Sequence, residues 1–371
     1  MSLTFYANGP ATVLDGRPSR EGYTEAVDGR SAKWPRRSVG KERRRAVGET
    51  LIKLTDDRVS WKVPTLFGND WVALSLAQAL NPLLPKPLFA TAYGCPACAW
   101  AGGRNPRMRK GLTEGELRRY FEAYRSVGAD CAFTFSRPDV GDYLDDAYCE
   151  LLLSLIDEYH GQAIVVDDRL ARHIRETHPA VSLVASYNRS IIDHAHGFGG
   201  LDEEDYYRCL LERFDEVVVR CEAAFEGGAL ENMTDVADRI QVIVNQKCIP
   251  NCPDGARHIA MTARSIEREA AEGERVLARC TQPLRKVKST VTIGPEHRRA
   301  LADRGFTLFK LQGRIAPATA VLKELLRNIL EDGMGIVGSE VLMPVVVTSL
   351  TLDGSGTDFD AMMGIPPSVE V

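Results

Sequence analysis

The sequence predicts an α/β fold of eight strands, a TIM-like (β/α)8 barrel, and three observations carry this prediction. Strand-like segments of four to seven residues alternate with helix-like segments or long connections from residue 58 to about residue 330. This span fits the ~250 residues typical of a (β/α)8 barrel. No Gly-x-Gly-x-x-Gly opens any of the expected helices, which counts against a doubly wound, dinucleotide-binding sheet, the alternative architecture.

The expected strands are short apolar runs. They cover residues 59–63, 87–93, 132–136, 163–166, 181–186, 216–219, 240–244 and 306–311. Pro87 stands at the first position of its strand, where a missing N–H is tolerated. The expected helices cover residues 71–84, 113–124, 144–159, 169–177, 203–214 and 318–330, with a short helix near Asp235. Thr113 and Glu116 have the spacing of a capping box, which places the start of the second helix.

Three regions follow from this pattern. Residues 1–57 form a basic N-terminal extension without apolar periodicity, either a solvated arm or a lid or subunit-docking arm. Residues 58–330 form the barrel, with a long insertion at 247–305 before the last strand. Residues 331–371 form a C-terminal extension, in which the apolar run 341–352 is expected to be an added strand or an interface segment.

Composition restricts the class of protein. The chain has 371 residues, of which 44% are hydrophobic and 26% are charged, as in globular proteins. No apolar stretch approaches the ~20 residues of a membrane span, and the N-terminus lacks a signal-peptide pattern, so we expect a cytoplasmic protein without a membrane partner. The formal charge of −5 gives no general attraction to nucleic acid. Nine cysteines in a reducing compartment indicate buried thiols or metal ligands rather than disulfides.

The most informative segment is Cys248-Ile-Pro-Asn-Cys252-Pro, which closely follows the expected seventh strand. Pro250 and Pro253 hold this loop extended and keep it from becoming a helix. A strand that ends in a stiff loop with two thiols is a suitable mount for a metal ion or a cluster. We therefore expect Cys248 and Cys252 to bind the same metal centre.

The barrel topology groups further cysteines at the same end. Cys95 and Cys98 lie just past the second strand, and Cys280 lies in the insertion before the eighth. Because active sites of this fold lie at the C-terminal ends of the strands, these three and the Cys248–Cys252 pair are expected to share one rim. The other cysteines fall within or beside helix and strand patterns and are expected to be packing residues. These are Cys131, Cys149, Cys209 and Cys221.

Polar and basic residues also follow the strands. Singly, each is best explained as a solvated or salt-bridged side chain, but together they predict a positive barrel mouth that binds a carboxylate or phosphate. The expected substrate-binding residues are Arg104, Arg137, Asn188, Arg220 and Arg314. Lys310, on the eighth strand, either holds the anionic group of the substrate or forms an interior ion pair, for example with Glu222. His258 is a candidate acid–base group or fourth metal ligand, or simply a residue at a helix start, and Asp193 to Gly200 is expected to be a flexible lid.

Three segments resemble a known family. Residues 244–253, His258 and residues 305–314 are similar to the collagenase-like peptidase family (the U-thirty-two peptidases), nearest to its anaerobic ubiquinone-hydroxylase branch. The resemblance implies a TIM-barrel-like fold and a [4Fe–4S] cluster held by four cysteines. By this resemblance the ligands are Cys98 (with Cys95 as the alternate), Cys248, Cys252 and Cys280. Thiolates at such spacing also suit a tetrahedral zinc, and a metal-free dithiol remains open.

Two classes of function follow. The first is an iron–sulfur-dependent redox enzyme that carries out an oxygen-independent hydroxylation or related oxidation of an anionic small molecule or peptide; an electron-transfer partner and a homo-oligomer are compatible with it. The second is a hydrolase of the peptidase kind, although the chain has no recognisable Ser or Thr nucleophile motif and no His-Glu-x-x-His. A barrel that keeps a structural zinc without catalysis is the third alternative.

Overall fold

The computed structural model describes residues 52–102, 112–272, 291–313, 316–333, 335 and 342–352, with the backbone alone for 265–272 and 348–352. The expected extension at 1–57 therefore lies almost wholly outside the described residues. Three site predictions also lie outside them, those for Arg104, Cys280 and Arg314.

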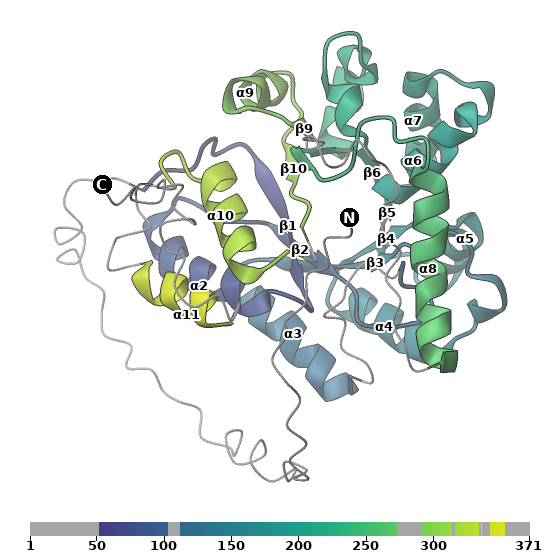
Figure 1. Cartoon of the computed structure of the whole chain (residues 1–371), viewed down its shortest axis with the longest axis horizontal. Coiled ribbons are helices and arrows are strands. Elements are labelled where there is room, and N and C mark those ends of the chain that lie inside the picture. The colour runs from purple at the N-terminus through teal and green to yellow at the C-terminus, as the bar shows by residue number, and fades with distance from the viewer. Residues whose placement is uncertain are drawn as a thin grey trace, which may run out of the picture. The chain divides into compact units, whose positions relative to one another are not determined.

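Eight parallel strands close into a barrel, which confirms the predicted fold (Figure 1). The strands are β1 (Ser60–Leu66), β2 (Thr91–Gly94), β3 (Asp130–Phe135), β4 (Gln162–Val165), β5 (Ser182–Ala185), β6 (Glu216–Val219), β7 (Ile240–Ile243) and β10 (Leu308–Lys310). Around the barrel their order is β1-β10-β7-β6-β5-β4-β3-β2. Because all eight strands run parallel, the loops that follow them meet at one end, which we call the barrel mouth.

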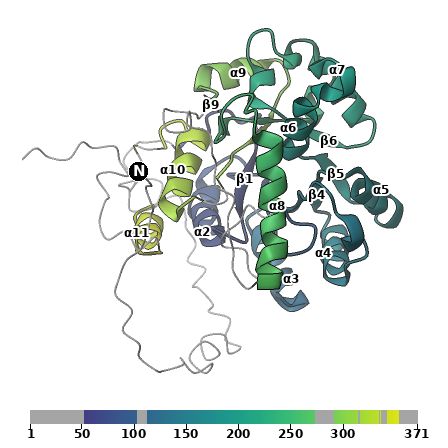
Figure 2. The same cartoon turned by 45° about the vertical axis from the view of Figure 1, so that its right-hand side comes forward.

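Helices cover the outside of the barrel (Figures 1 and 2). They are α2 (Asp70–Leu80), α3 (Glu114–Ser126), α4 (Ala147–Glu158), α5 (Asp168–Thr177), α6 (Tyr187–Ala195), α7 (Glu203–Leu211), α8 (Gly255–Glu272), α9 (Pro295–Asp303), α10 (Ala318–Ile329) and α11 (Met343–Leu352). Side-chain oxygens cap several N-termini, and the predicted capping box of Thr113 and Glu116 is present. In the described part of the chain, no helix is both long and apolar enough to cross a membrane.

The core has two layers because side chains alternate between the two faces of each strand. The larger layer lies between the barrel and its helices. The smaller layer fills the barrel itself. It consists of Tyr93, Ala132, Ile164, Val184, Tyr187, Val218 and Ile243. Tyr187 is the first residue of α6, so this helix closes down onto the barrel interior just after β5.

Three expectations are wrong. The predicted lid at 193–200 is instead the end of α6 followed by a 3-10 turn, Gly197–Gly200, because Ser186 caps a helix that places Tyr187 and Ile191 on the barrel core. Residues 343–352 of the apolar run form helix α11, so the alternative of an added strand is wrong; α11 packs with α10 and α2 (Figure 1). Cys209 is exposed on α7 rather than packed, because it faces away from the buried stripe of that helix.

The insertion at 247–305 also has structure of its own. It contains α8, which packs against α6 (Figure 2), and α9. A short antiparallel ribbon pairs β8 (Asn245–Gln246) with β9 (Val291–Thr292). Gly255 at the start of α8 permits the contact with α6, since a Cβ there would lie 2.6 Å from Cγ2 of Ile191. The loop with Cys248 and Cys252 is therefore held between this ribbon and the α6–α8 contact.

Candidate functional site

A small pocket at the barrel mouth contains both cysteines of the loop after β7. We call it the mouth pocket. It is lined by Tyr187, Ile191, His194, Arg220, Glu222, Cys248, Ile249, Asn251 and Cys252. These residues come from α6, from the loop after β6 and from the loop after β7, all of which follow neighbouring strands. The cavity is about 20 Å³, which is room for one water molecule or one ion but not for a substrate.

Hydrogen bonds from the loop after β6 fix the cysteine loop. The backbone N–H of Asn251 donates to Oε1 of Glu222 at 2.9 Å, and Nη1 of Arg220 donates to Oδ1 of Asn251 at 2.5 Å. Asn251 has a φ of 49°, in the left-handed region that asparagine tolerates better than most residues. The loop then turns into α8, where the N–H of Gly255 donates to the carbonyl of Cys252 at 3.0 Å. The loop that carries the two thiols is thus held by the turn at Gly255 and by the hydrogen bonds of Asn251 with Glu222 and Arg220.

Arg220 supplies positive charge at this pocket. The residue is 6% exposed, and its Nε donates to Oε1 of Glu203 at 2.8 Å. Its guanidinium also lies 5.6 Å from the centre of the Phe198 ring. Burial disfavours the charge, but the bond to Glu203 outweighs it and raises the pKa of Arg220 above its usual value. Arg220 was predicted as a substrate-binding residue, and the structure places it at the mouth.

Two further groups of the mouth pocket are unusual in their surroundings. Burial, and then the positive charge of Arg220, lower the pKa of His194, so its imidazole is neutral at pH values near 7. Glu222 accepts hydrogen bonds through Oε1, whereas its Oε2 is buried without a hydrogen-bond partner in the described part of the chain. The pocket therefore offers two thiols, a neutral imidazole and a carboxylate oxygen that is not otherwise engaged.

The early cysteines have different surroundings. Cys95 and Cys98 are buried in the core outside the barrel, with their Sγ atoms 3.7 Å apart. Cys98 also has a hydrogen bond with Cys149 of α4, and burial raises the pKa of both Cys98 and Cys149 well above the usual value. These three thiols form a buried cluster that shares no lining residue with the mouth pocket. Cys131, Cys149 and Cys221 are buried, as predicted for packing residues.

The remaining predicted residues are engaged in the fold. Arg137 donates to the main-chain oxygens of Asp139 at 2.6 Å and Ala99 at 3.3 Å. The backbone N–H of Asn188, which is 5% exposed, donates to Oγ of its helix cap Ser186 at 3.2 Å. These contacts give Arg137 and the backbone of Asn188 a part in holding the loops after β3 and β5.

Lys310 lies inside the barrel, 5% exposed. Its Nζ donates to Oε1 of Gln241 at 3.4 Å and lies 4.2 Å from the centre of the Tyr93 ring.

His258 lies in the first turn of α8, where its N–H donates to the carbonyl of Asp254, and it does not line the mouth pocket. His194 occupies that pocket instead. The sequence Asp-His-Ala-His around His194 could have marked it as a candidate site residue, but the glycines that follow are typical of a loop.

A metal ion or cluster is implied by the family resemblance, and the described donors fit it only in part. Among the described residues, no group of three or more His, Cys, Asp or Glu side chains is arranged to hold a metal ion. Cys248 and Cys252 would supply two thiolates of a four-thiolate set. The early pair packs with Cys149, and the other predicted ligand, Cys280, lies outside the described residues.

Comparison with known proteins adds a distant likeness. No family model and no curated protein matches the chain. A solved structure of a U32 peptidase is similar to it at 14% sequence identity and a TM-score of 0.39, over 61% of this chain and 85% of that chain. A likeness of this size assigns no function, so the closed barrel itself establishes the fold and the mouth pocket must establish the chemistry.

Proposed function

We propose that Cys248 and Cys252 bind a metal centre at the barrel mouth, and that the chain is an iron–sulfur-dependent redox enzyme. Its reaction would be an oxygen-independent hydroxylation or related oxidation of an anionic small molecule or peptide. The observation that carries the proposal is that both thiols of a proline-stiffened loop line one ion-sized cavity. This cavity lies at the end of the barrel where active sites of the fold occur.

The exposure of the cysteines supports this choice of ligands. Cys248 and Cys252 are partly exposed, whereas Cys95, Cys98 and Cys149 are buried among apolar side chains. Thiols that can be reached from solvent and are held by polar anchors suit metal binding better than thiols whose ionisation is opposed by burial. The same pair would also suit a zinc ion, so a non-catalytic barrel with a structural zinc is the competing proposal.

The proposed anionic substrate is supported by the charge at and below the mouth. Arg220 lines the mouth pocket, and Lys310 lies deeper, inside the barrel. Because the cavity itself is only about 20 Å³, the substrate would lie outward of it, across the loops after β5, β6 and β7. His194, neutral and half-buried at the same pocket, replaces His258 as the proposed group that takes or gives a proton.

Metal content of cysteine variants tests this proposal. The full chain should be purified without oxygen, and its metal and visible absorption measured for the native protein, Cys248→Ser and Cys252→Ser. Cys209→Ser is the matched control, because this thiol is exposed on α7, outside the mouth pocket. We expect a brown native protein, a brown control, and loss of most metal in the two loop variants. Full metal occupancy in Cys252→Ser would exclude ligation by this residue, and a colourless protein with one zinc would favour the competing proposal.

A hydrolase remains the second candidate because of one observation. His194 lines the same pocket as Cys248 and Cys252, and its lowered pKa leaves it able to accept a proton from a thiol. In this case the native protein would contain no metal, alkylation of one loop thiol would abolish hydrolysis of acidic peptides, and His194→Gln would slow alkylation of that thiol. Equal alkylation rates in the native protein and His194→Gln would remove the support for this candidate.

A further inference from the structure

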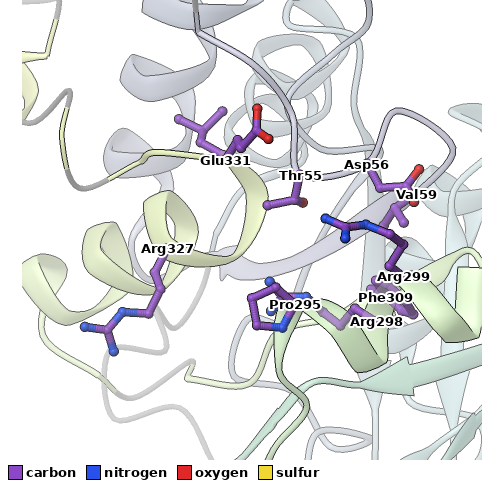
Figure 3. Close-up of a pocket in the computed structure, with 10 residues that line it drawn as sticks. Thr55, Asp56, Val59, Pro295, Arg298, Arg299, Phe309, Arg327 and Glu331 are labelled. Atoms are coloured by element: carbon purple, nitrogen blue, oxygen red, sulfur yellow. The ribbon is translucent and has the colours of Figure 1, made fainter.

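A second pocket lies on the outside of the barrel. It opens between the first turn of α9, the last turn of α10 and the segment that leads into β1 (Figure 3). Its lining includes three arginines, Arg298, Arg299 and Arg327, and two carboxylates, Asp56 and Glu331. It shares no lining residue with the mouth pocket, so its chemistry is independent of the function proposed above.

Arg298 is a buried cation that the described residues do not neutralise. It is 5% exposed, and its Nη1 donates to Oδ1 of Asn328 at 2.5 Å and to the main-chain oxygen of Ile293 at 3.5 Å. Its guanidinium lies 5.7 Å from the centre of the Trp61 ring. All three partners are neutral, and burial lowers the pKa of Arg298. A buried charge with neutral partners alone is costly, so an anion that enters this pocket would gain from it.

None of the nearby carboxylates forms an ion pair with Arg298 among the described residues. Asp56 is bound by Arg58, whose Nη2 lies 2.6 Å from its Oδ2. Glu324, which orients the Asn328 amide, is paired with Lys247 at 3.0 Å. Glu331 has no ion pair with any described residue, and the same holds for Arg299 and Arg327 within the described ranges. The pocket therefore carries positive charge in excess.

The placement of the arginines is suited to a ligand that enters from solvent. Figure 3 shows the Arg299 side chain extending toward Thr55 and Asp56, while Arg327 stands on the α10 side of the pocket. Both are exposed, whereas Arg298 is buried.

The size of the cavity limits the ligand. Its volume is about 100 Å³, about five times that of the mouth pocket, which has room for one water molecule. That is room for one phosphate group. Guanidinium groups bind phosphate oxygens in pairs, and phosphate carries more charge than a carboxylate. We propose that this pocket binds one phosphate group, as inorganic phosphate or as the end of a phosphorylated small molecule, with Arg298 at its base and Arg299 at its opening.

Phosphate binding to the full chain tests this proposal. Titration calorimetry and thermal unfolding should be followed with inorganic phosphate, with glycerol 3-phosphate and with acetate, at constant ionic strength. The variants are Arg298→Met and Arg299→Gln, and Arg119→Gln is the matched control, because this exposed arginine of α3 lies outside the pocket. We expect phosphate to raise the Tm of the native protein and the control. It should have no effect on Arg298→Met, and its Kd should rise about tenfold or more in Arg299→Gln.

A separate result distinguishes a binding site from a structural arginine. Without phosphate, Arg298→Met should have a Tm equal to or above that of the native protein, because it removes a buried charge that lacks an anionic partner. Tighter binding of glycerol 3-phosphate than of phosphate would identify a phosphorylated molecule as the ligand, and the reverse would identify the free ion. The proposal is overturned if phosphate leaves the native Tm unchanged, if acetate acts as strongly, or if all variants respond alike. If Arg298→Met does not fold, the Kd of phosphate for Arg299→Gln tests the proposal instead, and an unchanged Kd overturns it.

Discussion

Charged residues inside the barrel are held in one hydrogen-bonded network. Nζ of Lys62, on β1, lies 2.6 Å from Oε2 of Glu216, on β6, and 2.9 Å from Oε1 of Gln162. Gln241 donates to the same carboxylate oxygen of Glu216 at 2.6 Å. Burial acts to raise the pKa of Glu216, but the charge and hydrogen bond of Lys62 outweigh it and hold that pKa below its usual value. Burial outweighs the charge of Glu216 in its effect on Lys62 and lowers the pKa of that ammonium group, and the 2.6 Å contact joins the two groups as an ion pair.

Removal of one partner of this pair should be costly. We expect Lys62→Met to lower the free energy of unfolding by about 2–3 kcal/mol, somewhat less than for a fully buried pair, because it leaves the partly buried Glu216 carboxylate without its counter-charge. Lys62→Met combined with Glu216→Gln should recover part of this loss. Urea unfolding of the native protein and the variants measures it, with Lys53→Met, an exposed lysine, as the control. A loss below about 0.5 kcal/mol in Lys62→Met, comparable to a surface substitution, would contradict this account of the pair.

The hydrogen-bond partners of single residues could be predicted from the sequence only in part. The sequence indicated that a lysine on an interior strand, Lys310, needs a partner or a use. It could not indicate the partners, because Gln241 and Tyr93 come from other strands and meet Lys310 only in the closed barrel. Arg137 is similar, since its main-chain acceptors depend on the course of two loops.

The strands were predictable because each is a nearly continuous apolar run, as expected for strands buried on both faces. Strand β6 coincides with its prediction, and the others differ at their ends. Helix α6 was missed because the glycines after it obscured its pattern and because its first residue packs into the barrel. Helix α9 was not predicted, and α8 was predicted only through the alternative that His258 lies at a helix start, because the prolines of the cysteine loop are typical of extended chain.

The turn between β1 and α2 contains a carboxyl group with a raised pKa. Oδ1 of Asp70, the first residue of α2, accepts from the N–H of Phe67 at 2.9 Å and from the hydroxyl of Tyr124 at 3.0 Å. Phe67 has a φ of 62°, a conformation that is strained for a bulky residue. The hydrogen bond from its N–H to Asp70 helps to hold the turn in this conformation. Burial raises the pKa of Asp70 from 3.8 to about 7, more than its hydrogen bonds lower it.

This pKa predicts a dependence of stability on pH. Because the folded state holds the Asp70 proton more tightly than the unfolded state, its contribution to stability is full below pH 3.8 and is lost as the pH rises through about 7. Asp70→Asn keeps an acceptor for Phe67 but cannot ionise. Between about pH 5 and about pH 8 the native protein should therefore lose about 2 kcal/mol more unfolding free energy than Asp70→Asn does. Urea unfolding at both pH values measures this, and parallel changes in the two proteins would show that Asp70 does not titrate in this range.

At the scale of the whole molecule, strand order decides which loops can form a site. The loops after β5, β6 and β7 are neighbours and build the mouth pocket, whereas β1 and β10 lie between β2 and β7. The sequence correctly placed each cysteine pair just past a strand. It could not show that Cys149 of α4 packs with the early pair, which gives Cys95 and Cys98 surroundings different from those of Cys248 and Cys252.

The central claim is that the mouth pocket belongs to an iron–sulfur redox enzyme, and iron and acid-labile sulfide per chain test it most directly. Both should be measured in the full chain purified without oxygen, beside Cys252→Ser purified in the same way. The account predicts about four iron and about four sulfide per native chain, as in a [4Fe–4S] cluster, and a loss of most of both in the variant. A native protein with no iron and no sulfide, or with a single zinc in their place, would contradict it.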